Sequence, residues 1–190
     1  MDDAGTGSPS PGDEERWPRR RVLRWACALA ALAAVTLVLL WGANRPADPH
    51  LAARAARTPV AGFGEVAFRV GAGGSASRCA LVADTQAQQE QGLMNRTDLS
   101  GYDGMLFRFP ADTSVQFYMK DTPMPLSIAW FDSSGRFVSS SDMEPCLGTA
   151  QCPLFSAAAP YRDALEVAKG GLGTLGIGPG AHLTVGGACP

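Results

Sequence analysis

The sequence has little charge and almost no imbalance of charge. Only 18% of its 190 residues are charged, 16 Lys and Arg stand against 18 Asp and Glu, and the formal net charge is −2. A nucleic-acid-binding protein generally needs a basic surface to neutralise phosphates. Acidic residues also outnumber basic ones from residue 60 onward. The sequence therefore predicts no nucleic-acid partner.

Histidine is equally scarce. His50 lies in a Pro-containing segment, and His182 lies in a short apolar run near the C-terminus, where we interpret it as structural. There is no C-x-x-C pair and no histidine pair with metal-ligand spacing. Methionine thioethers can bind Cu(I), but these methionines form no Met-x-Met cluster, and filling an irregular core is their usual role. The sequence predicts no metal and no other cofactor. The methionines in question are Met94, Met105, Met119, Met124 and Met143.

A nucleotide site is also excluded, although residues 171–176 (GLGTLG) match G-x-G-x-x-G. A dinucleotide-binding fold needs a following helix, a further strand and an acidic residue about 20 positions on. Only 14 residues without an acid follow the last of these glycines. We interpret the segment as a flexible loop before the last strand.

The N-terminal quarter has the pattern of a membrane anchor. Residues 1–24 are polar and end in a basic cluster, and residues 25–43 carry no charge and have Trp at both ends. Nineteen helical residues reach roughly 28 Å, close to the hydrocarbon thickness of a bilayer. Basic residues on the N-terminal side place that end in the cytoplasm. We expect a single-pass protein of the cell membrane whose C-terminal domain lies outside. The basic cluster is Arg16, Arg19, Arg20, Arg21 and Arg24.

Cleavage is the alternative for this segment, which would make the protein a secreted one. Residues 19–24 also loosely resemble a twin-arginine export signal. Residues 44–59 contain three prolines and are interpreted as a linker. Of the five cysteines, Cys27 lies within the apolar span and stands apart from the other four.

Residues 60–190 are expected to form the exported domain. Short apolar or alternating runs recur between turn signals, as is typical of β-strands. Thr85 and Gln88 have the spacing of a capping box, which predicts one short helix to about Met94. Ser133-Ser134-Gly135 predicts a hairpin turn. The fold class is mainly β (α+β), a compact β-sandwich-like or barrel-like domain with one short helix. The expected strands are 65–70, 79–83, 105–109, 115–119, 126–131, 136–139, 164–167 and 182–185.

Two disulfides are predicted in this domain, because thiols oxidise in exported proteins. Cys146 and Cys152 bracket a short loop and are expected to pair. Cys79 would then pair with Cys189, which ties an early strand to the C-terminus. The five-residue gap between Cys146 and Cys152 fits neither a redox motif nor usual zinc spacing.

Several blocks occur together in one order between about Gly64 and Val185. They include 91–96 (QGLMNR), 104–109 (GMLFRF), 117–126 (FYMKDTPMPL), 143–146 (MEPC), 164–167 (ALEV) and 176–180 (GIGPG). In this order the chain resembles the domain-of-unknown-function family number 192. The resemblance implies a compact β-sandwich-like fold that is often exported, and it supplies no mechanism.

The sequence departs from the pattern of that family at four positions. Tyr118 stands where Trp is usual, Asp121 where Asn is usual, Ser127 where Asp is usual, and Ala181 where an Asp commonly follows the glycine. The change at Ser127 removes a carboxylate, which puts any activity that needs an acid there in doubt.

The strongest candidate for ligand binding is the segment 117–125. Strand alternation places Tyr118 and Lys120 on one face, where an aromatic ring beside an ammonium group could hold an anionic or sugar-like ligand. The competing interpretation is a structural ion pair between Lys120 and Glu166. The complete candidate set is Arg96, Tyr118, Lys120, Thr122 and Glu166.

The sequence favours a membrane-tethered, non-enzymatic domain that binds an envelope glycan, a small molecule or a protein. A cell-envelope hydrolase is the first alternative, because Asp103, Asp142, Glu144 and Glu166 could supply a carboxylate pair. However, no spacing identifies such a pair, and we assign no catalytic residue. A protein–protein interaction module without a small ligand is the second alternative.

Overall fold

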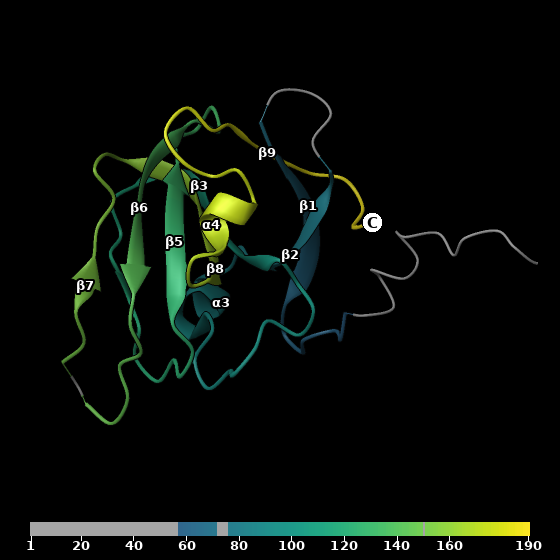
Figure 1. Cartoon of the computed structure of the whole chain (residues 1–190). Helices are drawn as coiled ribbons and strands as arrows, with labels where there is room; N and C mark the ends of the chain where they lie inside the picture. The colour runs from purple at the N-terminus through teal and green to yellow at the C-terminus, as the bar shows by residue number, and fades with distance from the viewer. Residues whose placement is uncertain (1–56, 72–75, 150) are drawn as a thin grey trace, which may run out of the picture. The chain divides into compact units, whose positions relative to one another are not determined.

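A computed structural model describes residues 57–71, 76–149 and 151–190 (Figure 1). The predicted cytoplasmic tail, the apolar span with Cys27 and most of the linker lie outside the described residues. Within those residues, no helix has the length and apolar character needed to cross a bilayer.

The described chain is mainly β, as predicted. Seven strands form one sheet in the order β6-β5-β8-β3-β2-β1-β9, and β4 and β7 form a separate pair. The helices are α3 (Gln86–Gln91) and α4 (Gly171–Thr174). The strands are β1 (Gly64–Val70), β2 (Arg78–Ala83), β3 (Gly104–Thr113), β4 (Phe117–Tyr118), β5 (Leu126–Phe131), β6 (Phe137–Met143), β7 (Leu154–Phe155), β8 (Tyr161–Ala168) and β9 (Leu183–Val185).

Strand β8 lies inside the sheet, antiparallel to both β3 and β5. Its neighbour β5 is buried at all six positions, as is expected of a strand covered on both faces. Strands β2 and β3 are parallel, with α3 in the connection between them.

The sheet curls so that the starts of its edge strands β6 and β9 approach each other, and the domain is a half-barrel and not a sandwich of two packed sheets. The residue before β6 and the residue before β9 form a bridge, Arg136 with His182. The Leu183 amide donates to the Gly135 carbonyl at 2.7 Å, and the Phe137 amide donates to the Ala181 carbonyl at 3.0 Å. The predicted hairpin turn at 133–135 is confirmed, and it forms part of this junction.

Gly135 is needed where these two edges meet. Its φ is +84°, and a Cβ built on it would lie 2.2 Å from the Leu183 carbonyl oxygen. We expect Gly135→Ala to lower the free energy of unfolding by about 2–3 kcal/mol, through left-handed backbone strain and overpacking. Gly178→Ala is the matched control, because nothing lies within 4 Å of its Cβ position. Urea denaturation of both variants checks the prediction, and equal midpoints would contradict it.

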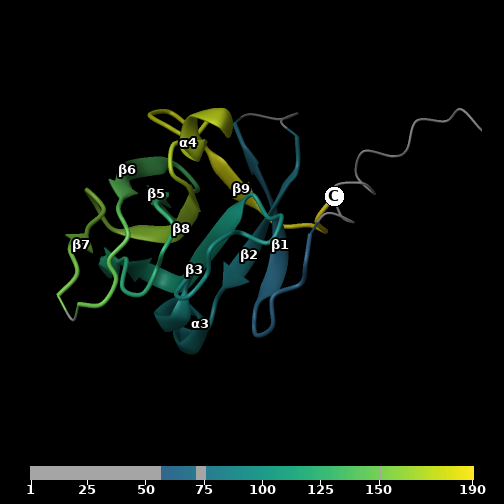
Figure 2. The ribbon, with the colours of Figure 1, turned by 60° about the horizontal axis from the view of Figure 1, so that its bottom comes forward.

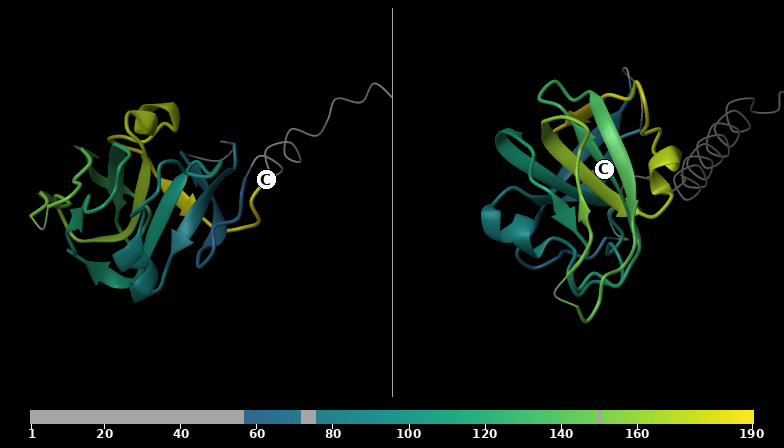
Figure 3. Two further views of the ribbon diagram at one scale, coloured as in Figure 1. Left: turned by 90° about the horizontal axis from the view of Figure 1, so that it is seen from below. Right: turned by 90° about the vertical axis from the view of Figure 1, so that its left-hand side faces the viewer.

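Two apolar cores lie on opposite faces of the sheet. The first core includes Met105, Ile128 and Trp130, and α3 lies on its side of the sheet. The second core includes Leu106 and Leu165, with side chains from the α4 region packed against it. Figures 2 and 3 show α3 and α4 on opposite sides of the domain.

The structure also corrects details of the predicted elements. The capping box at Thr85 is present, but the helix after it ends at Gln91 instead of near Met94. Residues 171–174, expected to be a flexible loop, form the short helix α4. The β7 strand was not predicted, because two residues carry too short a pattern to detect.

Candidate functional site

A cavity of about 280 Å³ opens on the first-core side of the sheet. We call it the Glu166 cavity, after the buried acid in its wall. Its volume lies just below the range of about 300–1,000 Å³ that is common for small-molecule sites. The lining comes from α3 and the turn after it, β3, the segment around β4, and one residue each of β5 and β8. It comprises Gln86, Gln89, Glu90, Gln91, Gly92, Leu93, Met94, Phe107, Phe109, Val115, Gln116, Phe117, Tyr118, Met119, Thr122, Leu126 and Glu166.

Aromatic rings form one wall of the Glu166 cavity. Phe107 and Phe109 share a face of β3 and both line it. The Phe107 ring meets the Phe117 ring edge to face, with 5.0 Å between centroids. Phe117 in turn packs against Trp130 at 6.2 Å. The wall is therefore continuous with the first core, which holds the rings in place.

Glu166 is the one charged residue that the interior of the sheet contributes to this cavity. Alternation along β8 puts Glu166 and Ala164 on the first-core face, with Leu165 and Val167 on the other. The neighbouring strands place Met105 and Ile128 beside it. The residue is only 4% exposed.

The Glu166 carboxyl has no hydrogen-bond or ion-pair partner among the described residues. Burial alone raises its pKa from 4.5 to about 8. At neutral pH the group is therefore mostly a neutral acid, which can donate a hydrogen bond or give up its proton. A buried ionisable side chain in a cavity is the arrangement that marks candidate binding sites.

The helix side of the cavity is fixed by glutamine side chains. Gln89 donates to the Arg108 carbonyl at 2.7 Å, and Gln88 donates to the Gly62 carbonyl at 2.7 Å. These bonds join α3 to β3 and to the segment before β1. The chain then turns at Gly92, whose φ is +47° and whose Cβ position lies 3.4 Å from the Phe107 ring.

A second set of contacts beside the cavity consists of two linked turns and a disulfide. The Asn95 amide donates to the Asp121 carbonyl at 2.7 Å, and both residues have positive φ. Asn and Asp tolerate this conformation better than most residues, which explains how Asp121 can replace the usual Asn of the family pattern. The Asp121 amide donates to the carbonyl of Cys146, which is bonded to Cys152. This disulfide closes a loop that precedes β7, and β7 is the strand that pairs with β4.

Three of the five predicted ligand residues line the cavity: Tyr118, Thr122 and Glu166. Lys120 is exposed and lies outside the lining, and among the described residues it makes no ion pair with Glu166. Arg96 also lies outside the lining, and its guanidinium donates to the Ser100 hydroxyl at 2.6 Å. The predicted alternation is present, with Phe117 and Met119 buried and Tyr118 and Lys120 exposed. It is the buried pair and Tyr118 that face the cavity.

Sequence reasoning missed the aromatic and amide part of the lining. The strand predicted at 105–109 already carried a signal, because Phe107 and Phe109 must share a face with Met105. No sequence pattern identified Glu90 or Gln116, because each lies in a separate segment that only the tertiary fold brings to the cavity.

The carboxylates considered for hydrolysis do not converge. Asp103 accepts from the Cys79 amide at 2.9 Å, and Glu144 pairs with Lys169. Asp142 accepts from the Ser127 hydroxyl at 2.5 Å. Of the four candidates, Glu166 alone lines the cavity. A pair of carboxylates facing each other across a substrate is therefore not formed by these residues.

Ser127 lies on the sheet face opposite the Glu166 cavity. It is the residue after Leu126 on β5, and its hydroxyl accepts from the Gly170 amide at 2.9 Å, next to α4. Asp142, its register partner on β6, supplies a carboxylate there. The substitution at 127 thus leaves the chemistry of the cavity intact.

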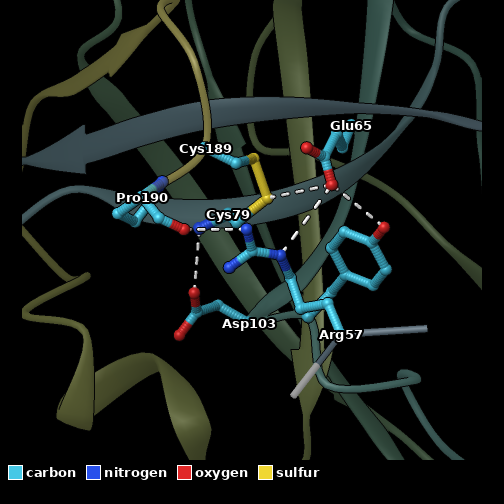
Figure 4. The surroundings of a disulfide bond; sticks show 7 residues. Arg57, Glu65, Cys79, Asp103, Cys189 and Pro190 are labelled. Carbon is cyan, nitrogen blue, oxygen red and sulfur yellow. Dashed lines mark hydrogen bonds and ion pairs between the residues drawn. A yellow bond between two sulfur atoms is a disulfide. The ribbon is translucent and has the colours of Figure 1, made fainter. Parts of the chain in front are cut away.

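Both predicted disulfides of the domain are confirmed. Cys79 is bonded to Cys189 across 110 positions, and Cys146 to Cys152 across six. Figure 4 shows the first bridge beside Glu65 and Arg57. Ligand atoms of Glu65, Cys79 and Cys189 lie within 4.8 Å of one another. Because both sulfurs are in the disulfide and Glu65 accepts from the Tyr102 hydroxyl at 3.1 Å, these residues suit a structural junction better than a metal ion.

No curated protein matches the chain. A solved structure from Novosphingobium aromaticivorans DSM 12444, described as a protein of unknown function, is 30% identical with a TM-score of 0.56. That match covers 68% of this chain and 91% of the other. A structure from Sinorhizobium meliloti 1021, described as a "putative transcription regulator", is 25% identical with a TM-score of 0.55. It covers 67% of this chain and 98% of the other.

Comparison with family models confirms the family that the sequence blocks resemble. The model of the DUF192 family, described as "Uncharacterized ACR", matches residues 69–185. This range includes β8 with Glu166 and every strand of the sheet except most of β1. The chain therefore belongs to the DUF192 family, whose function is unknown.

Proposed function

We propose that this protein is a non-enzymatic binding module, held at the outer face of the cell membrane, that takes a small molecule into the Glu166 cavity. The observation that carries the proposal is the buried, unpartnered Glu166 carboxyl in the wall of an aromatic-lined cavity. Because no described protein group bonds to this carboxyl, a ligand in the cavity can use its full hydrogen-bonding capacity. The apolar span at 25–43 supports the tether, and two disulfides are typical of exported domains.

Binding fits the geometry better than hydrolysis does. The second acid of the lining, Glu90, is exposed on α3 and accepts from Gln86 at 2.8 Å. A glycosidase or a related hydrolase needs two carboxyl groups positioned on either side of one bond. The cavity instead combines one buried carboxyl with aromatic, apolar, hydroxyl and amide side chains, a mixture that is typical of recognition sites.

We expect 2-phenylethanol, a neutral probe with an aromatic body, to raise the melting temperature of the full chain because it binds only the folded state. Val115 lines the cavity and is 52% exposed, so Val115→Trp should block the mouth without disturbing the core. The variant should weaken binding about tenfold or more. Thermal-shift titration measures both effects.

Leu147→Trp is the matched control for this experiment. Leu147 is 57% exposed and lies outside the lining, so the added ring should leave probe binding unchanged. Equal binding by the Val115→Trp variant, or equal loss in both variants, would contradict the assignment of the cavity.

A further inference from the structure

The charged side chains of the Glu166 cavity have one sign. Among the described residues that line it, Glu166 and Glu90 are the charged ones, and none is Lys, Arg or His. The other lining side chains are apolar, aromatic, hydroxyl or amide. When a cation takes the place of the Glu166 proton, both acids of the cavity carry negative charge within low-dielectric walls, which favours a bound cation and disfavours an anion.

The rings of the cavity wall also suit a cation. Phe107, Phe117 and Tyr118 come from two neighbouring segments and all line the same space. The face of an aromatic ring attracts an ammonium group within about 6 Å, most strongly where water is excluded. Apolar rings at the same time provide contacts for the carbon body of a ligand.

We propose that the Glu166 cavity binds a small organic ammonium ion, with the ammonium group at the Glu166 carboxylate and the apolar body against the Phe107–Phe117 wall. This inference rests on the proposed function and names its ligand class. It differs from the anionic or sugar-like ligand that Tyr118 and Lys120 suggested in the sequence, because Lys120 lies outside the cavity.

Binding of this kind is coupled to a proton. Burial keeps the Glu166 carboxyl protonated at neutral pH, so a bound ammonium ion displaces a proton, which passes to the buffer. The groups that face Glu166 from the adjacent strands are Met105 and Ile128, which do not titrate. The other titratable groups of the lining are Glu90 on α3 and Tyr118 on β4.

Three probes with the same aromatic body separate this inference from the proposed function. Isothermal titration calorimetry of the full chain at pH 7 compares 2-phenylethylammonium, neutral 2-phenylethanol and anionic 3-phenylpropionate. We expect the ammonium probe to bind about tenfold or more tightly than the alcohol, and the anion to bind most weakly. Titrations in phosphate and in Tris should reveal about one proton released for each ammonium ion bound.

Glu166→Gln keeps the shape of the side chain and removes its charge. The variant should lose the preference for the ammonium probe over the alcohol, and it should lose the proton release. Asp84→Asn is the matched control, because Asp84 is exposed and lies outside the lining, and this variant should retain both properties. If the alcohol or the anion binds as tightly as the ammonium ion, the ligand class is wrong while the binding function stands. If none of the three probes binds, the proposed function fails as well.

Discussion

Glu166→Gln is expected to stabilise the protein at alkaline pH and to flatten the dependence of its stability on pH. The folded protein holds this carboxyl with a pKa near 8, whereas the value is 4.5 when it is free in water. The difference corresponds to an upper bound of roughly 5 kcal/mol. This is a large part of the 5–15 kcal/mol typical of a folded domain.

The sign follows from the number of protons that each state binds. Between pH 4.5 and about 8 the folded state keeps the proton on Glu166 and the unfolded state loses it. The free energy of unfolding therefore falls as the pH rises through this window, and the group causes no further change above it. Glutamine binds no proton in either state, so the free energy of unfolding of the variant should not fall across this pH window.

Urea denaturation of both proteins at pH 5, 7 and 9 measures the effect. Glu90→Gln is the control, because Glu90 lines the same cavity but is exposed. Burial also raises the pKa of Asp163, against the opposing effect of Arg108, and this contribution stays in every variant. Parallel pH profiles for the Glu166→Gln variant and the original protein would show that the carboxyl is solvated or paired in the folded state.

The secondary structure of the domain could largely be predicted from local patterns. Turn residues and alternation identified most strands of the sheet, and the Thr85 capping box identified α3. The arrangement of the strands could not be predicted in this way. The contact between the two edges of the half-barrel joins Gly135 to Leu183, and nothing within either segment specifies the other.

The candidate site was only partly predictable for the same reason. Strand alternation pointed to Tyr118, and Thr122 and Glu166 belonged to the same candidate set, but the surroundings of all three depend on strand register. Glu166 is buried because β3 and β5 place Met105 and Ile128 beside it, residues that lie 61 and 38 positions away in the chain. A shift of one residue in register would turn Glu166 to the second-core face. Lys120 is the opposite case. It lies two residues from Tyr118 in the sequence, which suggested a shared site, but in the fold Lys120 lies outside the cavity that Tyr118 lines.

The cysteine pairing could be predicted because only three connectivities exist for four cysteines, and one of them includes an obvious short loop. The two bridges differ greatly in what they constrain. The bond from Cys79 to Cys189 spans most of the domain, and the bond from Cys146 to Cys152 closes a loop of a few residues. Their expected contributions to stability differ accordingly.

We expect the double variant Cys79→Ala/Cys189→Ala to lose about 5 kcal/mol of the free energy of unfolding, according to the chain-entropy account of cross-links. The melting temperature should fall on the order of 15 °C. The bridge holds the C-terminal segment beside β1, where the Ala67 amide donates to the Gly187 carbonyl and the Gly186 amide donates to the Ala67 carbonyl. Arg57 also donates to the Pro190 carbonyl at 2.8 Å (Figure 4). Without the bridge, the C-terminal segment depends on these few bonds.

Cys146→Ala/Cys152→Ala is the matched control, with an expected loss of about 2 kcal/mol because its loop is so much shorter. Calorimetry of both variants without a reducing agent measures how much unfolding free energy each variant has lost. The short-loop variant should also bind 2-phenylethanol more weakly, since the Cys146 carbonyl holds the Asp121 turn beside the cavity. The long-loop variant should bind it normally below its own melting temperature, because the lining includes neither Cys79 nor Cys189. A larger loss of stability in the short-loop variant would mean that native contacts, and not chain entropy, determine what each bridge contributes.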